Sequence, residues 1–189
     1  MQNAALDGGL ADPPRDAAYA FRAALGALAR PGTLHEIAGA TAPPPCSAAA
    51  ATLIATLCDP TTPLYIAPSH EAQAFRDWIT FQTGAPLVAA QDAVFAIGTW
   101  DALAPLAPYA VGTPAYPDRS TTLIVETPAL EAQGAVLSGP GIETTARLSL
   151  PEIAAFQQNR ARFPLGLDFF FTCGSMVAGL PRSTHVTEG

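Results

Sequence analysis

The sequence predicts a single α/β domain with a mixed β-sheet flanked by helices. Helical and strand-like segments are interspersed along all 189 residues, and no repeat or linker divides them. The composition is 49% hydrophobic and 13% charged, which is enough apolar material for one sizeable core. Residues 167–173 are apolar on both faces apart from Asp168 and Thr172, as in a central strand covered by helices. We expect the domain to span residues 13–189 after a flexible N-terminal arm, residues 1–12.

The first expected helix covers residues 13–30. Asp12 suits its N-cap, and Pro31-Gly32 stops it. Three large apolar residues recur at i, i+4 and i+7, and the pattern predicts that they face the core: Phe21, Leu25 and Leu28.

The remaining elements follow from local patterns. Further helices are expected at 46–57, from a Ser69 cap to residue 82, and from a Ser149–Glu152 capping box to residue 160. Runs of apolar and β-branched residues predict the strands 33–37, 64–67, 86–89, 93–98, 121–127, 135–138, 144–148, 167–173 and 176–180. We expect 144–148 to pair with 135–138. The prolines of 38–45 predict a loop.

The charged residues exclude two classes of function. The net charge is −7 and no basic run occurs, so nucleic-acid binding is not expected. All nine basic residues are arginine. Because a Schiff base with pyridoxal phosphate requires a lysine amine, that form of covalent catalysis is excluded.

The cysteines and the N-terminal segment predict a cytoplasmic protein. Cys46, Cys58 and Cys173 are an odd number without a paired framework, which fits a reducing compartment. Residues 1–16 show no basic and apolar leader pattern, and no apolar run is long enough to span a bilayer. We therefore expect no membrane partner.

A glycine-rich turn follows the expected strand 135–138, in the sequence Ser138-Gly139-Pro140-Gly141. Backbone N–H groups of such a turn can bind a phosphate. However, Pro140 lacks one donor, and the turn leads into a strand rather than a helix. The sequence favours a tight hairpin turn, with a phosphate cradle as the alternative.

Asp168 interrupts the apolar strand and requires a partner if it is ionised, because a buried unpaired charge is costly. Three cationic or titratable side chains near it in the sequence could serve: Arg162, Arg182 and His185. The sequence favours a structural ion pair, or a carboxylate that accepts backbone N–H bonds. A polar cluster that binds an anionic ligand is the alternative.

No catalytic set, metal site or cofactor site is expected. His35, His70 and His185 lack metal-ligand spacing. Cys173 and His185 are the one conceivable nucleophile and base, but a thiol in an apolar strand is usually inert. Arg160 and Arg162 lie near a helix end, where they suit the last carbonyls better than an anion.

Short strings in a characteristic order run along almost the whole chain. The C-terminal ones are Phe163-Pro-Leu-Gly-Leu-Asp168, Thr172-Cys-Gly174 and Pro181-Arg-Ser-Thr-His-Val186. The upstream ones are Ala20-Phe-Arg22, Arg30-Pro-Gly32, Asp59-Pro-Thr-Thr-Pro-Leu64, Phe81-Gln-Thr-Gly-Ala-Pro-Leu-Val88 and Leu137-Ser-Gly-Pro-Gly-Ile142. Together they make the chain resemble the PhnH family, the H subunits of the bacterial carbon–phosphorus lyase system.

The resemblance implies a fold like the large domain of pyridoxal-phosphate-dependent transferases, without the cofactor site. It implies a homodimer in isolation and a core complex with subunits G, I and J. That complex is understood to displace adenine from ATP with an alkylphosphonate, giving ribose 1-phosphonate 5-triphosphate. A separate iron–sulfur subunit then cleaves the carbon–phosphorus bond.

The expected function is a structural or regulatory subunit that is not catalytic by itself. The alternative is a subunit that contributes a nucleotide- or phosphonate-binding pocket. Such a pocket would be built from Ser138, Gly139, Gly141, Asp168, Arg182 and His185. An autonomous enzyme of unknown reaction is a third hypothesis.

Overall fold

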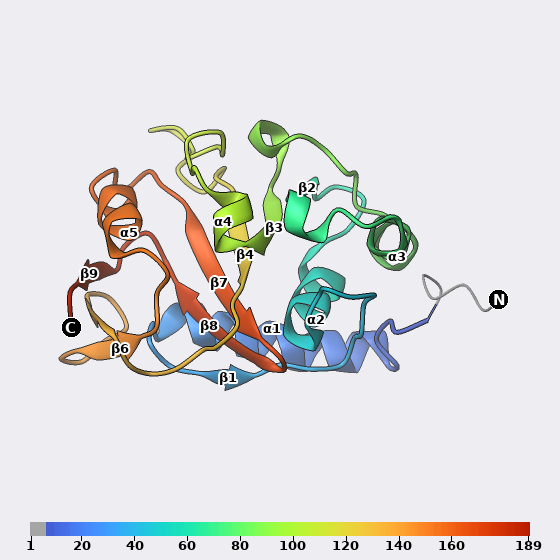
Figure 1. The fold of residues 1–189 in the computed structure, drawn as a ribbon, viewed down its shortest axis with the longest axis horizontal. Coiled ribbons are helices and arrows are strands. Elements are labelled where there is room, and N and C mark those ends of the chain that lie inside the picture. Colours follow the sequence, from blue (N-terminus) through green and yellow to red (C-terminus); the bar gives the residue numbers. More distant parts are fainter. Residues whose placement is uncertain (1–6) are drawn as a thin grey trace.

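A computed structural model describes residues 7–189 and shows a large mixed sheet between two helical layers, with a small sheet at one end (Figure 1). The α-helices are α1 (Pro13–Ala29), α2 (Ala48–Leu57), α3 (Gln73–Thr83), α4 (Trp100–Leu103) and α5 (Ile153–Arg160). The strands are β1 (His35–Glu36), β2 (Leu64–Ile66), β3 (Phe95–Thr99), β4 (Thr122–Glu126), β5 (Ala135–Ser138), β6 (Ala146–Leu148), β7 (Asp168–Cys173), β8 (Met176–Leu180) and β9 (His185–Thr187).

The large sheet has the strand order β1-β8-β7-β4-β3-β2. Strands β2, β3, β4 and β7 are parallel to one another. At one edge, β8 pairs antiparallel with β7, and β1 pairs antiparallel with β8. The α/β class and the mixed sheet are therefore confirmed, and β7 occupies the central position expected of residues 167–173. The small sheet, β6-β5-β9, is antiparallel and includes the predicted pairing of β5 with β6.

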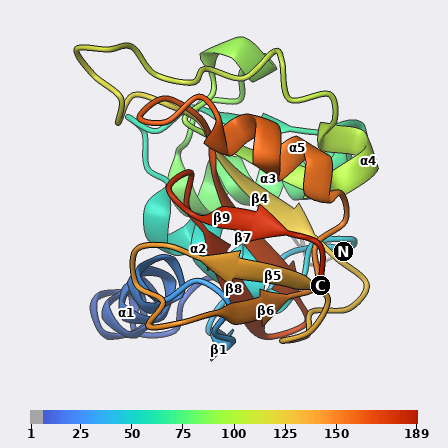
Figure 2. The same cartoon turned by 90° about the vertical axis from the view of Figure 1, so that its left-hand side faces the viewer.

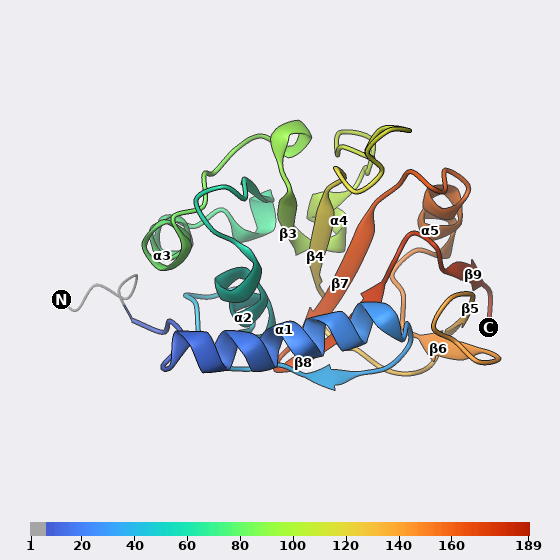
Figure 3. The ribbon, with the colours of Figure 1, turned by 180° about the vertical axis from the view of Figure 1, so that it is seen from behind.

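The central strands send alternate side chains into two cores, as the two-residue period of a strand requires. Residues on one face pack with α1, α2 and α3: Ile97, Ile124, Phe170 and Val177. Residues on the other face pack with α4, α5 and the small sheet: Ala96, Leu123, Val125, Phe169, Phe171, Ala178 and Leu180. Figure 3 shows α1 crossing the first of these faces, over β7 and β8.

The small sheet links the second face to the end of α1. Figure 2 shows β5, β6 and β9 side by side, with α5 on one side and α1 on the other. Strand β9 packs against α5. At the other side, Gly32 lies against the side chain of Ala146, so the turn after α1 touches β6.

The predicted inward stripe of α1 is wrong for Phe21 and Leu25 and holds only for Leu28, which packs against the core. Phe21 is 53% exposed and Leu25 is 56% exposed, while Leu28 is partly buried. The buried residues are instead Ala20, Ala24 and Ala27. The reason is the close approach of α1 to β8, where a Cβ placed on Gly179 would lie 2.6 Å from the backbone of Ala27. Only a face of small side chains permits that spacing.

Two of the three predicted N-terminal caps, Ser69 and Ser149, are also wrong, because tertiary contacts use their side chains. Ser69 lies in a 3₁₀ turn, Pro68–His70, and its hydroxyl accepts the Thr99 N–H at 3.0 Å. Ser149 accepts the Glu131 N–H at 2.9 Å, and α5 begins at Ile153 without a side-chain cap.

Two elements, α4 and β9, were not predicted. Residues 86–89 contribute one bridge, Leu87 to Leu64, rather than a full strand. Asp12 stands at the start of α1, but its side chain makes no capping bond.

The start of the described chain packs on the domain. The Trp78 indole donates to the Asp7 carbonyl, and the Thr41 N–H donates to the Gly8 carbonyl. Residues 1–6 of the predicted arm lie outside the described residues, and the arm's flexibility stays a prediction. Within residues 7–189, no helix has the length and apolar character to cross a bilayer.

Candidate functional site

Asp168 and Arg182 form one polar cluster beside the start of β7. The Arg182 guanidinium donates to Oδ2 of Asp168 at 2.5 Å and to Oδ1 at 3.1 Å, and the Arg182 backbone N–H donates to Oδ1 at 2.8 Å. Arg182 also donates to the Pro117 carbonyl and the Ser120 hydroxyl. Arg182 is therefore the partner of Asp168, and its hydrogen bonds fasten the loop before β4 to the sheet.

Ser138, Gly139 and His185 come together separately, in the small sheet. Ser138 on β5 pairs with His185 on β9. A Cβ placed on Gly139 would lie 3.8 Å from the His185 ring. The Arg160 guanidinium donates to Nε2 of His185 at 3.1 Å and to the Ser183 carbonyl at 3.1 Å. These contacts tie the end of α5 to β9.

Gly141 faces the end of α1. A Cβ at this position would lie 2.0 Å from the Ala29 carbonyl oxygen, so only glycine fits. The Ile142 N–H donates to the Gly139 carbonyl, which closes the turn between β5 and β6. The turn therefore meets a helix end rich in carbonyl oxygens, a surrounding that suits a cation better than an anion.

The six predicted ligand residues thus fall into two clusters and one glycine turn. Within residues 7–189, no hydrogen bond or ion pair joins the Asp168–Arg182 pair to His185 or to the Ser138 turn. Ligand binding by these six residues stays a prediction.

The cysteines have no catalytic surroundings. Cys173 lies at the far end of β7 from Asp168, where its thiol contacts the Pro128 carbonyl, whereas His185 contacts Arg160. Burial raises the pKa of the Cys46 and Cys58 thiols, so neither thiol ionises readily. No group of three or more His, Cys, Asp or Glu side chains in the described part of the chain could hold a metal ion.

A buried cluster at the carboxyl ends of the parallel strands was not predicted. Glu126 ends β4 and accepts the Ser47 N–H at 2.6 Å and the Thr172 hydroxyl at 3.1 Å. His70 follows β2, and its Nε2 lies 4.0 Å from Glu126 without a hydrogen-bond partner. Ligands of open α/β sheets bind at this edge, so the position of Glu126 at the end of a predicted strand could have signalled the cluster.

Burial sets the protonation of both groups. It raises the pKa of Glu126, although hydrogen bonds from Ser47 and Thr172 act in the opposite direction. It lowers the pKa of His70, which is 1% exposed. Desolvation therefore favours the uncharged form of each side chain.

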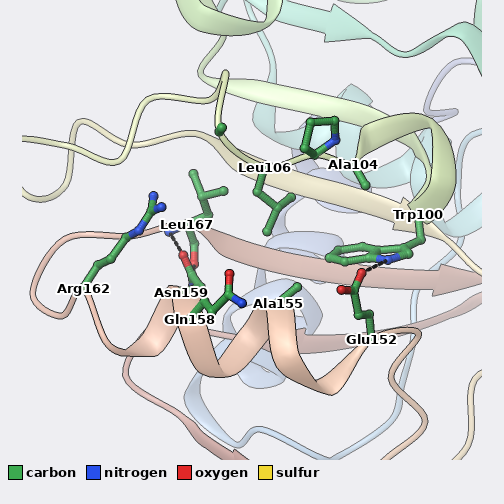
Figure 4. Close-up of a pocket in the computed structure, with 11 residues that line it drawn as sticks. Trp100, Ala104, Leu106, Glu152, Ala155, Gln158, Asn159, Arg162 and Leu167 are labelled. Carbon is green, nitrogen blue, oxygen red and sulfur yellow. Dashed lines mark hydrogen bonds between the residues drawn. The ribbon is translucent and has the colours of Figure 1, made fainter.

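A pocket with several polar side chains in its lining lies beneath α5 (Figure 4). The pocket has a volume of about 240 Å³ and lies between α5, α4 and residues 104–107. Its lining residues are Trp100, Ala104, Pro105, Leu106, Ala107, Glu152, Ala155, Gln158, Asn159, Arg162 and Leu167. Sequence reasoning missed it, because its walls come from segments about fifty residues apart.

Comparison with known proteins agrees with the resemblance seen in the sequence. The model of a family described as bacterial phosphonate metabolism protein (PhnH) matches residues 8–187. A curated relative from Rhizobium meliloti (strain 1021) is 38% identical over 194 aligned residues, covering 98% of this chain and 97% of the relative. That relative is alpha-D-ribose 1-methylphosphonate 5-triphosphate synthase subunit PhnH.

Proposed function

The chain belongs to the PhnH family of bacterial phosphonate metabolism proteins, and we propose that it is a structural or regulatory subunit of a ribose 1-methylphosphonate 5-triphosphate synthase. The observation that carries this proposal is the match to a synthase subunit along nearly the full length of both chains. Because the alignment covers 98% of this chain and 97% of the relative, the two chains share this domain along nearly its whole length.

The proposed assembly is the carbon–phosphorus lyase core with subunits G, I and J. Its reaction joins an alkylphosphonate to ATP with loss of adenine. In isolation the chain is a homodimer, and it works in the cytoplasm. Its fold is like that of the large domain of pyridoxal-phosphate-dependent transferases, although the sequence has no lysine to hold that cofactor.

Two features of the described residues support a role by docking. First, apart from the residues that line the pocket, the nucleophiles and titratable groups described above are buried or already bonded within the fold. Second, the largest exposed hydrophobic side chains gather partly on α1, where Tyr19, Phe21 and Leu25 are all more than half exposed. Exposed aromatic and leucine side chains are typical of surfaces that meet a partner.

A subunit-omission experiment tests the proposal. Subunits G, I and J are co-expressed with and without this chain, and adenine release from ATP and methylphosphonate is measured. We expect the chain to co-purify with the other subunits, and its omission to abolish or strongly reduce adenine release. Full activity without the chain would contradict a required role.

The second candidate function is a nucleotide or phosphonate site formed by Ser138, Gly139, Gly141, Asp168, Arg182 and His185. The contacts of Asp168 and Arg182 favour a structural role for that pair, because each side chain has its partners within the fold. Calorimetric titration of the isolated chain with ATP and methylphosphonate decides between the two roles. Binding that is lost in Arg182→Gln but not in Arg162→Gln would support this second candidate.

A further inference from the structure

The pocket beneath α5 carries an inference that goes beyond the proposed function, which needs no ligand on this chain. We propose that this pocket binds a small organic phosphate or phosphonate, with its anionic group at Arg162 and a planar or apolar body between Leu106 and Trp100. The observations that carry it are the shape of the pocket, the hydrogen bonds that fix its walls and the charged groups that remain unpaired.

The walls of the pocket are fixed by hydrogen bonds within the fold. The Asn159 amide donates to the Leu167 carbonyl and accepts the Leu167 N–H, both at 2.8 Å. The Trp100 indole N–H donates to Oε2 of Glu152 at 3.2 Å. The Trp100 ring also packs on Phe156, with 4.9 Å between the ring centroids. A pocket held in this way is formed before a ligand arrives, which reduces the entropic cost of binding.

Two polar side chains at the pocket are unused by the fold, and a third is used in part. Among residues 7–189, the side chains of Arg162 and Gln158 make no hydrogen bond or ion pair, and Glu152 makes one bond through one oxygen. The neighbouring Arg160 differs, because it donates to Ser183 and His185. Arg162 is therefore the cation at this surface whose guanidinium is available to a ligand.

The side chains of Arg162 and Glu152 lie at opposite ends of an apolar floor. Figure 4 shows Arg162 at one end, Trp100 with Glu152 at the other, and Leu106, Ala155 and Leu167 between them. Glu152 and Arg162 lie beyond the two ends of α5, whose eight residues span roughly 12 Å along the helix axis. A ligand that satisfies both ends has an anionic group, a flat or apolar body, and a hydrogen-bond donor at the far end.

The anionic group is assigned by the chemistry of arginine. A planar guanidinium forms paired hydrogen bonds with phosphate or phosphonate oxygens. The relative's name includes a methylphosphonate and a triphosphate, so both anions are present where such a subunit works. Adenosine monophosphate matches all three parts of the pocket, and phenylphosphonate matches the anion and the flat body without the donor.

Fluorescence titration and calorimetry test the inference on the isolated chain. Trp78→Phe removes the other tryptophan and leaves Trp100 as the reporter, while calorimetry on the unaltered chain serves if that buried substitution unfolds the protein. The probes are adenosine monophosphate, phenylphosphonate, adenosine and inorganic phosphate. We expect saturable binding of the first two and weaker binding of the others.

Matched variants locate the site. Arg162→Gln should weaken binding about tenfold or more, the effect of losing a charge-assisted hydrogen bond. Arg76→Gln, on α3 at the other face, is the control and should leave affinity unchanged. Glu152→Gln should weaken the binding of adenosine monophosphate more than that of phenylphosphonate, because only the nucleotide has a hydrogen-bond donor for the Glu152 carboxylate.

Three results would overturn the inference. One is the absence of saturable binding of either anionic probe at about 10 mM, a concentration that detects very weak sites. Another is equal weakening by Arg162→Gln and Arg76→Gln. The third is binding of inorganic phosphate as tight as that of adenosine monophosphate, which would show an anion site to which the rest of the pocket adds no affinity. Each result leaves the omission experiment unaffected.

Discussion

The two faces of the large sheet are covered in different ways. On one face, α1 lies against β8 through alanines, and Gly179 allows the two backbones to approach closely. On the other face, α5 packs through Phe156 onto the rings of Trp100, Phe169 and Phe171. Trp100 of α4 and Phe156 of α5 are in contact there, and the pocket lies beside this contact. Small residues therefore make the contact between α1 and β8, while large aromatic residues make the contact between α5 and the second face.

The aromatic face should give the largest loss of stability. Phe156 is 2% exposed and contacts three rings, so Phe156→Ala should cost about 3 to 4 kcal/mol in the free energy of unfolding. Phe163→Ala is the control, because Phe163 is 50% exposed and should cost under about 1 kcal/mol. Urea unfolding measures both values, and similar losses would show that the ring cluster does not hold α5.

The contact between α1 and β8 should instead be destabilised by added side-chain volume. Gly179→Ala places a methyl group 2.6 Å from the Ala27 backbone, and we expect a loss of about 2 to 3 kcal/mol. Gly174→Ala is the control, because a Cβ there meets nothing within 4 Å and the cost comes from a φ of +59°, about 1 kcal/mol. Thermal and urea unfolding compare the two. A smaller loss for Gly179→Ala would mean that α1 can move away from β8 freely.

The Asp168–Arg182 pair should give an intermediate effect. Either alanine substitution leaves a partly buried charge without its partner, so each should cost about 2 kcal/mol. The double variant should lose less than the sum of the two single losses, with a coupling energy of about 1 to 2 kcal/mol. A double-mutant cycle by urea unfolding measures this coupling. Strictly additive losses would reject the structural pair.

The smallest expected effect is the pH dependence from His70 and Glu126. Burial lowers the pKa of His70, so below about pH 6.5 the unfolded chain binds more protons at this residue than the folded chain does. The contribution of His70 to the free energy of unfolding is therefore lost as the pH falls. Burial raises the pKa of Glu126, so its contribution to the free energy of unfolding declines as the pH rises above about 4.5. The two trends oppose each other, which keeps the net change small.

Two variants separate the trends. His70→Gln should lose less stability than the wild type between pH 7 and pH 5, whereas Glu126→Gln should lose more over the same range. Urea unfolding at several pH values measures the difference. Parallel curves for all three proteins would contradict the assigned pKa directions.

Local patterns predicted most elements, and tertiary contacts decided the features that were missed. The helix 13–30 was found from its proline and glycine boundaries, but its inward face was not, because Gly179 lies far away in the sequence. Ser69 and Ser149 have the residue type of a cap, yet the backbone of Thr99 and Glu131 uses their hydroxyls. Propensity is a weak guide where a distant partner competes for the same atom.

The candidate sites show the same limit. The partner of Asp168, Arg182, was among the three cationic or titratable side chains named, and the structure selects it. The pocket was not predicted, since it requires α4, residues 104–107 and α5 to meet. Arg162 looked like a helix-end residue, and only the contacts of Arg160 show which of the two arginines remains free.

The most direct test of the central claim, that this chain acts as a docked subunit, is an add-back titration. Purified chain is added to a preparation of the G, I and J subunits, and the initial rate of adenine release is measured against the amount added. Our account predicts no release by the chain alone, and a rate that rises and then saturates at stoichiometric addition. Adenine release by the chain alone, or a rate that is already maximal before any chain is added, would contradict it.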